Sequence, residues 1–151
     1  MSELVVTDPI DTSRISFVLG INNNFYSDDE NAINKNNIEF PTSYIANLIL
    51  DYMHDHNFED VSMTVTPVKG LYRMEYGCPE NGENLYRMTS LYNPLHDQSK
   101  EKWRDTIVNY ATMLSNYFNQ TACTIIIENY SVEHPLQLIY IKNKDDNRRM
   151  L

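Results

Sequence analysis

Two stretches of the chain repeat apolar residues at the spacing of an amphipathic helix. The first follows Phe40-Pro41, where Thr42 or Ser43 can cap a helix N-terminus. Its apolar stripe consists of Tyr44, Ile45, Leu48, Ile49, Tyr52 and Met53. The second follows Ser99, another candidate N-cap, and its stripe consists of Trp103, Ile107, Tyr110, Ala111, Leu114, Tyr117 and Phe118. The pattern predicts two helices that each bury one face.

Period-two alternation and short apolar runs predict strands around these helices. Val61, Met63 and Val65 alternate with polar residues, which is typical of a strand with one buried face. The run at 122–127 is almost continuously apolar and suits a strand buried on both faces. The predicted strands are residues 14–20, 61–67, 71–76, the stretch after Asn81-Gly82, 122–127 and 136–141.

The dipeptide Asn81-Gly82 is typical of a two-residue hairpin turn. A turn there would set Tyr72 opposite Leu91 and Tyr76 opposite Arg87. Large apolar side chains would then occupy both faces of the hairpin, the second face being formed by Leu71, Tyr86, Met88 and Tyr92. Either helices cover both faces, or another chain covers one of them. The last three of these residues are therefore candidates for binding a partner, because aromatic residues and Met are enriched in interface centres.

The predicted order of elements, β-α-β-β-β-α-β-β with short links, indicates an α+β fold. It consists of an antiparallel sheet of about five to six strands backed by two helices. The length of 151 residues suits a single domain, residues 1–151. Residues 22–38 are acidic and rich in Asn and predict a mobile surface loop. The polar tail at 143–151 is expected to fray.

Acidic residues outnumber basic residues by 21 to 12, which gives a net charge of −9. The excess lies in the first 68 residues, where the basic side chains are Arg14 and Lys35. Such a surface repels nucleic acid and favours a protein partner with a basic face. The acidic residues expected at this contact are Asp28, Asp29, Glu30, Asp51 and Asp55. Acidity that only keeps the chain in solution is the alternative explanation.

Three residues on the first predicted helix suggest a metal site. Asp51, His54 and Asp55 lie within one helical turn and could bind a divalent ion, with Glu59 or Asp60 completing the shell. A solvated acidic helix end is the simpler interpretation. The sequence lacks the nucleophile elbow, the glycine-rich phosphate loops and the H-E-x-x-H zinc motif. We therefore expect no cofactor, and the sequence favours a protein that is not an enzyme.

Cysteine usage and the N-terminus bear on location. Cys78 and Cys123 form no metal-binding or redox motif, and we expect both to be reduced. The N-terminus has no basic region followed by an apolar stretch, and no run approaches the ~20 apolar residues that span a bilayer. These observations predict a cytoplasmic protein.

From residue 40 to 142, the predicted order of elements and the acidity are similar to those of the secretion chaperones of type III systems. That resemblance implies a homodimer that holds a protein segment in extended form. The chain departs from it by adding a first strand and lacking a closing helix. The leading hypothesis is a non-enzymatic binding module of the inhibitor, immunity or secretion-chaperone type, from a phage or a bacterium. The alternatives are a metal-dependent hydrolase using Asp51, His54 and Asp55, and a small viral or phage assembly component.

Overall fold

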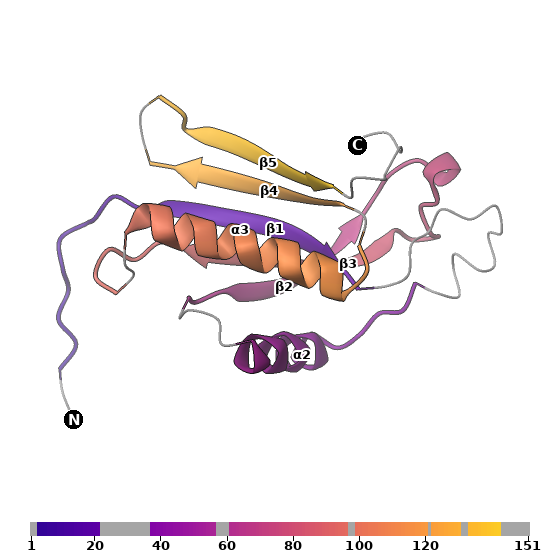
Figure 1. The fold of residues 1–151 in the computed structure, drawn as a ribbon, viewed down its shortest axis with the longest axis horizontal. Helices are drawn as coiled ribbons and strands as arrows, with labels where there is room; N and C mark the ends of the chain where they lie inside the picture. The colour runs from indigo at the N-terminus through magenta and orange to yellow at the C-terminus, as the bar shows by residue number, and fades with distance from the viewer. Residues whose placement is uncertain are drawn as a thin grey trace.

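Five antiparallel strands form one sheet in the order β2-β3-β1-β4-β5, so the N-terminal strand lies at its centre (Figure 1). The strands are β1 (Ser13–Gly20), β2 (Thr64–Gly70), β3 (Glu83–Leu91), β4 (Ala122–Asn129) and β5 (Leu136–Lys142). The helices are α2 (Thr42–Asp55), α3 (Lys100–Tyr117) and the short 3-10 helix η1 (Met74–Tyr76).

This computed structural model describes residues 3–21, 37–56, 61–96, 99–120, 122–130 and 133–142. The predicted mobile loop, apart from residues 37 and 38, and the predicted frayed tail lie outside the described residues.

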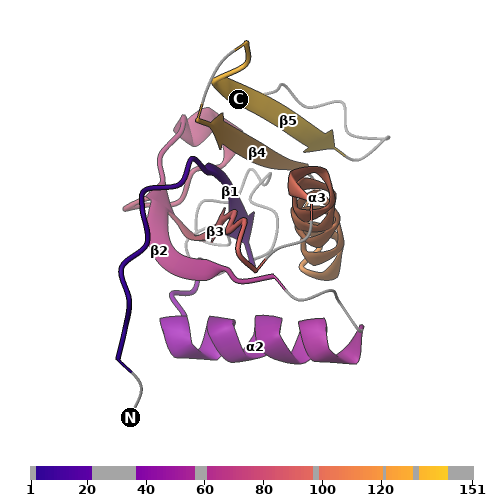
Figure 2. The ribbon, with the colours of Figure 1, turned by 90° about the vertical axis from the view of Figure 1, so that its left-hand side faces the viewer.

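Both helices pack against one face of the sheet (Figure 2). Helix α3 contacts β1 and β4, and helix α2 contacts β2. Alternation along β1 directs Ile15, Phe17 and Leu19 into the core, where they join Ile45 of α2 and Ile107 of α3. The structure confirms the predicted α+β class, with an antiparallel sheet of five strands and two helices.

The predicted helix starts are close to the observed ones. Ser99 caps α3, since its Oγ accepts a hydrogen bond from the backbone N–H of Lys102 over 3.1 Å. Helix α2 begins at Thr42, directly after Pro41, and has no side-chain cap. The sequence therefore located both helices, and α3 uses the capping chemistry that its sequence predicts.

The segment 71–76 is not a strand, and this prediction was wrong. Strand β2 runs on to Gly70 and itself pairs with β3, with Val65 opposite Met88 and Gly70 opposite Glu83. The other edge of β3 pairs with β1. Because a strand has only two edges to pair, no place remains on β3 for a third partner. The chain from residue 71 to 82 instead loops out through η1.

The Asn81-Gly82 dipeptide turns the chain, as predicted, but it joins this loop to β3. Both residues have positive φ angles, 67° for Asn81 and 88° for Gly82. The N–H of Gly82 donates to the carbonyl of Pro79 over 3.0 Å, which closes the turn. The hairpin register expected around this turn is therefore absent.

Two further findings concern membrane-spanning helices and the cysteines. Among the described helices, none is both long and apolar enough to cross a bilayer. Cys78 and Cys123 are free thiols, and burial raises the pKa of Cys123.

A buried hydrogen bond links α3 to the sheet and gives a test of the core. Trp103 is 3% exposed, and its indole Nε1 donates to Ser90 Oγ over 2.9 Å. We expect Ser90→Ala to lower the free energy of unfolding by about 1–3 kcal/mol, because the buried N–H loses its acceptor. Urea denaturation measures the change. The control is Ser43→Ala on the exposed side of α2, and a loss no larger than that of the control would contradict the prediction.

Candidate functional site

A half-buried carboxyl group lies where β3 begins. The hydroxyl of Tyr72, in the loop after β2, donates to Glu83 Oε1 over 2.8 Å. Burial raises the pKa of Glu83 above the ordinary value of 4.5, and the hydrogen bond from Tyr72 offsets part of that rise. A carboxyl group with a raised pKa and a fixed hydrogen-bond donor is a typical component of a functional site.

Two more residues converge on the same carboxyl group. Gly20 ends β1, and a Cβ built on it would lie 3.3 Å from Glu83 Oε2 and would clash with Gln120 Oε1. Gln120 directly precedes the segment that leads into β4. Its amide oxygen and the carboxyl group of Glu83 therefore approach the Cα of Gly20 from two different parts of the chain. The missing side chain of Gly20 keeps this space open. Tyr72, Glu83 and Gln120 therefore form the polar rim of one site, named here the Glu83 site.

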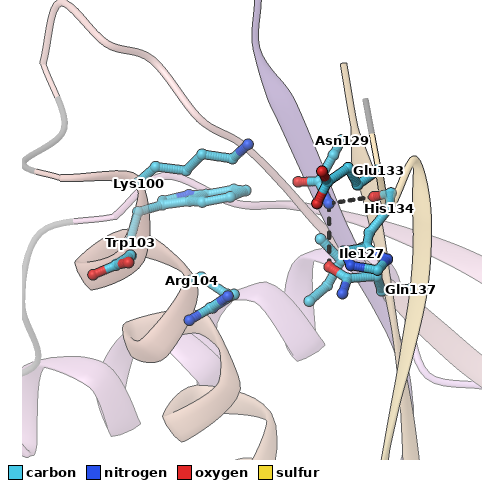
Figure 3. Close-up of a pocket in the computed structure, with 9 residues that line it drawn as sticks. Lys100, Trp103, Arg104, Ile127, Asn129, Glu133, His134 and Gln137 are labelled. Carbon is cyan, nitrogen blue, oxygen red and sulfur yellow. Dashed lines mark hydrogen bonds between the residues drawn. The ribbon is translucent and has the colours of Figure 1, made fainter. Parts of the chain in front are cut away.

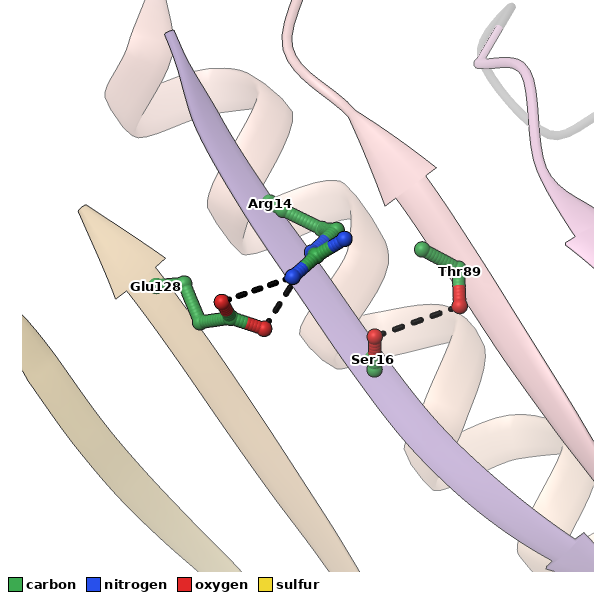
Figure 4. Close-up of polar contacts among 4 residues, drawn as sticks. All are labelled: Arg14, Ser16, Thr89 and Glu128. Carbon is green, nitrogen blue, oxygen red and sulfur yellow. Dashed lines mark hydrogen bonds and ion pairs between the residues drawn. The ribbon is translucent and has the colours of Figure 1, made fainter. Parts of the chain in front are cut away.

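The Glu83 site lies on the face of the sheet opposite α2 and α3. Alternation along β3 places Glu83 on the same face as Thr89, whose hydroxyl lies 3.2 Å from that of Ser16 (Figure 4). On this face Arg14 forms two hydrogen bonds with Glu128, at 3.2 and 2.8 Å. This pairing raises the pKa of Arg14 and lowers that of Glu128. Both side chains are well exposed, so the ion pair contributes little to stability.

A cavity of about 450 Å³ lies at the opposite end of the sheet. Figure 3 shows Lys100, Trp103 and Arg104 of α3 facing side chains from β4 and the turn after it. On that side Asn129 Nδ2 donates to the carbonyl of His134 over 2.9 Å and to Gln137 Oε1 over 3.2 Å. Charged side chains of both signs line the cavity together with Trp103 and Ile127.

The cavity and the Glu83 site are separated by the length of the central strand. β1 begins at Ser13, opposite Asn129 at the cavity, and ends at Gly20 beside Glu83. They are therefore two separate places on the molecule. Of these two places, the Glu83 site is the one that joins a carboxyl group with a raised pKa to a hydrogen-bond donor.

The three predicted partner-binding residues in and directly after β3 are not on an exposed face. Tyr86 and Met88 are 1% and 3% exposed and belong to the core beneath the helices. Tyr92 is half-buried, with its ring 5.4 Å from that of Trp103. The prediction of an aromatic binding surface was wrong because the even-numbered positions of β3 face the two helices, which alternation along the strand does not reveal.

The predicted acidic residues are only partly described. Asp51 and Asp55 are exposed on α2, whereas Asp28, Asp29 and Glu30 lie outside the described residues. A basic protein partner for them is untested and stays a prediction. Within the part of the chain that the structure describes, no group of three His, Cys, Asp or Glu residues could hold a metal ion. Asp51, His54 and Asp55 therefore do not form a metal site by themselves.

Sequence patterns do not predict the Glu83 site. The strand predicted at 71–76 includes Tyr72, and no motif distinguishes Glu83. The signal in the sequence is weak, since a Glu directly after a turn is most often solvated. The site is formed only when Gly20 of β1 and Gln120 before β4, both distant from Glu83 in sequence, come to lie beside it.

Comparison with known proteins places this geometry in a family. The model of the SAM lyase family matches residues 10–133, which include every residue of the Glu83 site. The chain belongs to the SAM lyase family.

Solved SAM lyases share the fold. A phage SAM lyase in complex with S-methyl-5'-thioadenosine superposes with a TM-score of 0.60 at 12% identity, over 95% of this chain and 99% of that one. A phage SAM lyase in the apo state gives a TM-score of 0.57 at 12% identity, over 94% and 98% of the two chains. Among curated proteins, none matches.

Family membership corrects the functional prediction. SAM lyases are enzymes, so the prediction of a non-enzymatic module of the inhibitor, immunity or secretion-chaperone type was wrong. The family also differs from the two alternatives, a metal-dependent hydrolase and a viral assembly component. The net negative charge does not distinguish a protein partner from a small positively charged ligand.

The pKa of Glu83 predicts how stability depends on pH. A carboxyl group with a raised folded-state pKa stabilises the fold below the unfolded value, near 4.5, and this contribution disappears as the pH rises through the folded value. Glu83→Gln removes the half-buried charge, so we expect it to raise the melting temperature at pH 7. The gain should vanish below about pH 4. Thermal denaturation across pH measures it, with Glu3→Gln as the exposed control. An equal melting temperature for Glu83→Gln and wild type at pH 7 would refute the burial argument.

Proposed function

We propose that this SAM lyase family member cleaves S-adenosylmethionine (SAM) at the Glu83 site and releases S-methyl-5'-thioadenosine. The observation that carries the proposal is that the family match includes a half-buried carboxyl group held by a tyrosine hydroxyl. The bound molecule in a similar structure supports the choice of product. The negative net charge supports the choice of substrate, because SAM carries a net positive charge.

The identity of the product defines the bond that breaks. SAM has a positively charged sulfur bonded to a methyl group, to the 5' carbon of adenosine and to the γ-carbon of an aminobutyrate. S-methyl-5'-thioadenosine keeps the first two groups. The sulfur–Cγ bond therefore breaks, and its electron pair stays on sulfur, which becomes neutral.

A lyase reaction uses no water, so the four-carbon fragment must replace the lost bond from within. Its own carboxylate can attack Cγ and close a five-membered lactone, which needs no base. Elimination to an alkene would require a base to remove a Cβ proton that no carbonyl activates directly. Ring closure also has the high effective molarity of a well-oriented intramolecular reaction. The proposed second product is accordingly the lactone, and atoms and charge balance without a co-reactant.

Glu83 is proposed to bind the α-ammonium group of SAM. A carboxylate beside the sulfur would slow the reaction, because the sulfur loses its positive charge in the transition state. The ammonium group keeps its charge throughout, so a carboxylate there binds and orients the substrate without opposing the reaction. Tyr72 holds Oε1, and Oε2 lies on the side of Gly20 and Gln120.

The activity is tested with purified protein and SAM in water enriched in ¹⁸O. We expect two products, S-methyl-5'-thioadenosine and a lactone whose ring oxygen carries no ¹⁸O. Chromatography and mass spectrometry identify both products. A hydrolase would instead place ¹⁸O on the hydroxyl of the four-carbon product. That outcome, or the absence of S-methyl-5'-thioadenosine, would overturn the proposal. Asp51→Asn, on the exposed side of α2, is the control and should retain full activity.

Two variants test the role of Glu83. Glu83→Gln should raise KM for SAM about 10- to 100-fold with a small change in kcat. The reason is that the lost charged contact is equally strong in the bound ground state and in the transition state. In the wild type, kcat/KM should fall at acidic pH as Glu83 is protonated, with a midpoint above 4.5. Tyr72→Phe removes a hydrogen bond that lowers the pKa of Glu83, so the midpoint should move to higher pH.

The matched control for the second variant is Tyr44→Phe, whose hydroxyl lies on the half-exposed start of α2. Steady-state kinetics from pH 4 to 9 measure all of these quantities. A midpoint that does not move in Tyr72→Phe would argue against Glu83 as the titrating group.

Two untested predictions remain beside this proposal. The cytoplasmic location suits an enzyme of SAM, which is an intracellular metabolite. The possible homodimer is compatible with the proposal and is measured by light scattering of the purified protein.

A further inference from the structure

One side chain is hydrogen-bonded to the backbone on both sides of Glu83. Asn37 Nδ2 donates to the carbonyl of Gly82 over 2.8 Å. Asn37 Oδ1 accepts from the backbone N–H of Asn84 over 2.9 Å. A single amide group therefore fixes the residue before Glu83 and the residue after it.

The side chain of Asn84 completes this arrangement. Its Nδ2 donates to the backbone carbonyl of Asn37 over 3.3 Å, and its Oδ1 accepts from Lys69 Nζ of β2. Asn84 is 7% exposed, so these hydrogen bonds are largely shielded from water. Buried amide groups that are hydrogen-bonded on both atoms hold a rigid geometry.

The pairing of β3 shows why the backbone around Glu83 needs the side-chain amide of Asn37. β1 ends at Gly20, opposite Leu85, so the residues of β3 before Leu85 have no partner in β1. A side-chain amide that bonds to a carbonyl and to an N–H two residues further along replaces a neighbouring strand. Asn37 thus extends the ladder past the end of β1, at the position of Glu83.

Asn37 is not needed merely to attach its own segment to the sheet. Three residues further on, the N–H of Phe40 donates to the hydroxyl of Tyr86 over 3.1 Å. The same hydroxyl donates to the carbonyl of Phe40 over 2.8 Å. These two bonds anchor the segment before α2, and the bonds of Asn37 act on Glu83 in addition.

We infer that Asn37 is a positioning residue, which holds the backbone around Glu83 so that its carboxyl group meets both the Tyr72 hydroxyl and the α-ammonium group of the substrate. The inference rests on the proposed function for its substrate. Its geometry, however, concerns Glu83 alone and can be tested without SAM. Asn37 itself touches neither the reacting atoms nor, through any hydrogen bond of the structure, Glu83's side chain.

The groups around Glu83 set the sign of the expected changes. Tyr72 donates to it, the amide of Gln120 lies across Gly20, and Lys69 is held by Asn84 on the opposite face of β3. Burial is the larger influence on the pKa of Glu83. Loosening the backbone admits water and therefore lowers that pKa toward 4.5, whereas a new negative charge nearby raises it.

Asn37→Ala and Asn37→Asp make these two changes separately. Alanine removes both bonds to the backbone around Glu83. Aspartate keeps the acceptor for the N–H of Asn84, loses the donor to Gly82 and adds a negative charge. The matched control is Asn47→Ala on the exposed side of α2. The pKa of Glu83 in each protein is followed by NMR titration of its ¹³C-labelled carboxyl group.

We expect the pKa of Glu83 to fall in Asn37→Ala, to rise in Asn37→Asp and to stay unchanged in Asn47→Ala. KM for SAM should rise about tenfold or more in Asn37→Ala, and the acid midpoint of kcat/KM should move to lower pH. A merely structural role would lower the melting temperature and leave both the pKa and the midpoint where they are.

An unchanged Glu83 pKa in Asn37→Ala would overturn the inference, whatever the activity. If Asn37→Ala does not fold, Asn37→Ser is titrated in its place, and a fall in the pKa of Glu83 is again the expected result. Failure of the proposed function is a different result, because the wild-type protein would then release no S-methyl-5'-thioadenosine while the titration still reports on Asn37.

Discussion

A strand can pair on two edges only, and in this protein β3 uses both of them over most of its length. β2 occupies one edge down to Glu83, while β1 stops at Gly20, opposite Leu85. The loop at 71–82 therefore has no edge to join, and it returns across the end of the sheet with Tyr72 against Glu83. Because β1 ends early, the first residues of β3 have no β1 residue beside them. The side chain of Asn37 bonds to the β3 backbone there, and Gly20 has no side chain to fill the space next to the Glu83 carboxyl group. The site follows from this pairing.

The parts of the fold that depend on local pattern were predictable from the sequence. The stripe of Trp103, Ile107 and Leu114 and the capping residue Ser99 determine where α3 lies and which face it buries. The segment 71–76 was not predictable in the same way, because its alternation suits a strand. Whether residues 71–76 form a strand depends on whether they or β2 pair with β3. The local sequence pattern does not describe such a competition between distant parts of the chain.

The same limit applies to the site. Glu83 lies beside Gly20, Gln120 and Tyr72, which come from three different parts of the chain, and its burial in the assembled fold raises its pKa. Sequence patterns identified instead the acids of α2, Asp51 and Asp55, because they are close together in sequence. In the structure these carboxylates are exposed to water. Burial distinguishes Glu83 from them, and burial is a property of the assembled fold.

The chain has none of the common catalytic motifs although its family consists of enzymes, and the proposed chemistry explains why none is needed. Nucleophile elbows, phosphate loops and zinc motifs supply a nucleophile, an anion site or a Lewis acid that the substrate lacks. SAM carries its own leaving group, the charged sulfur, and its own nucleophile, the carboxylate. A protein that cleaves it by ring closure has only to bind the substrate in the folded conformation and keep water from competing, and the rate then comes from orientation. Such a site needs one fixed charge in a shielded place, and Glu83 provides it. It needs no set of residues at a fixed spacing that a sequence motif would describe.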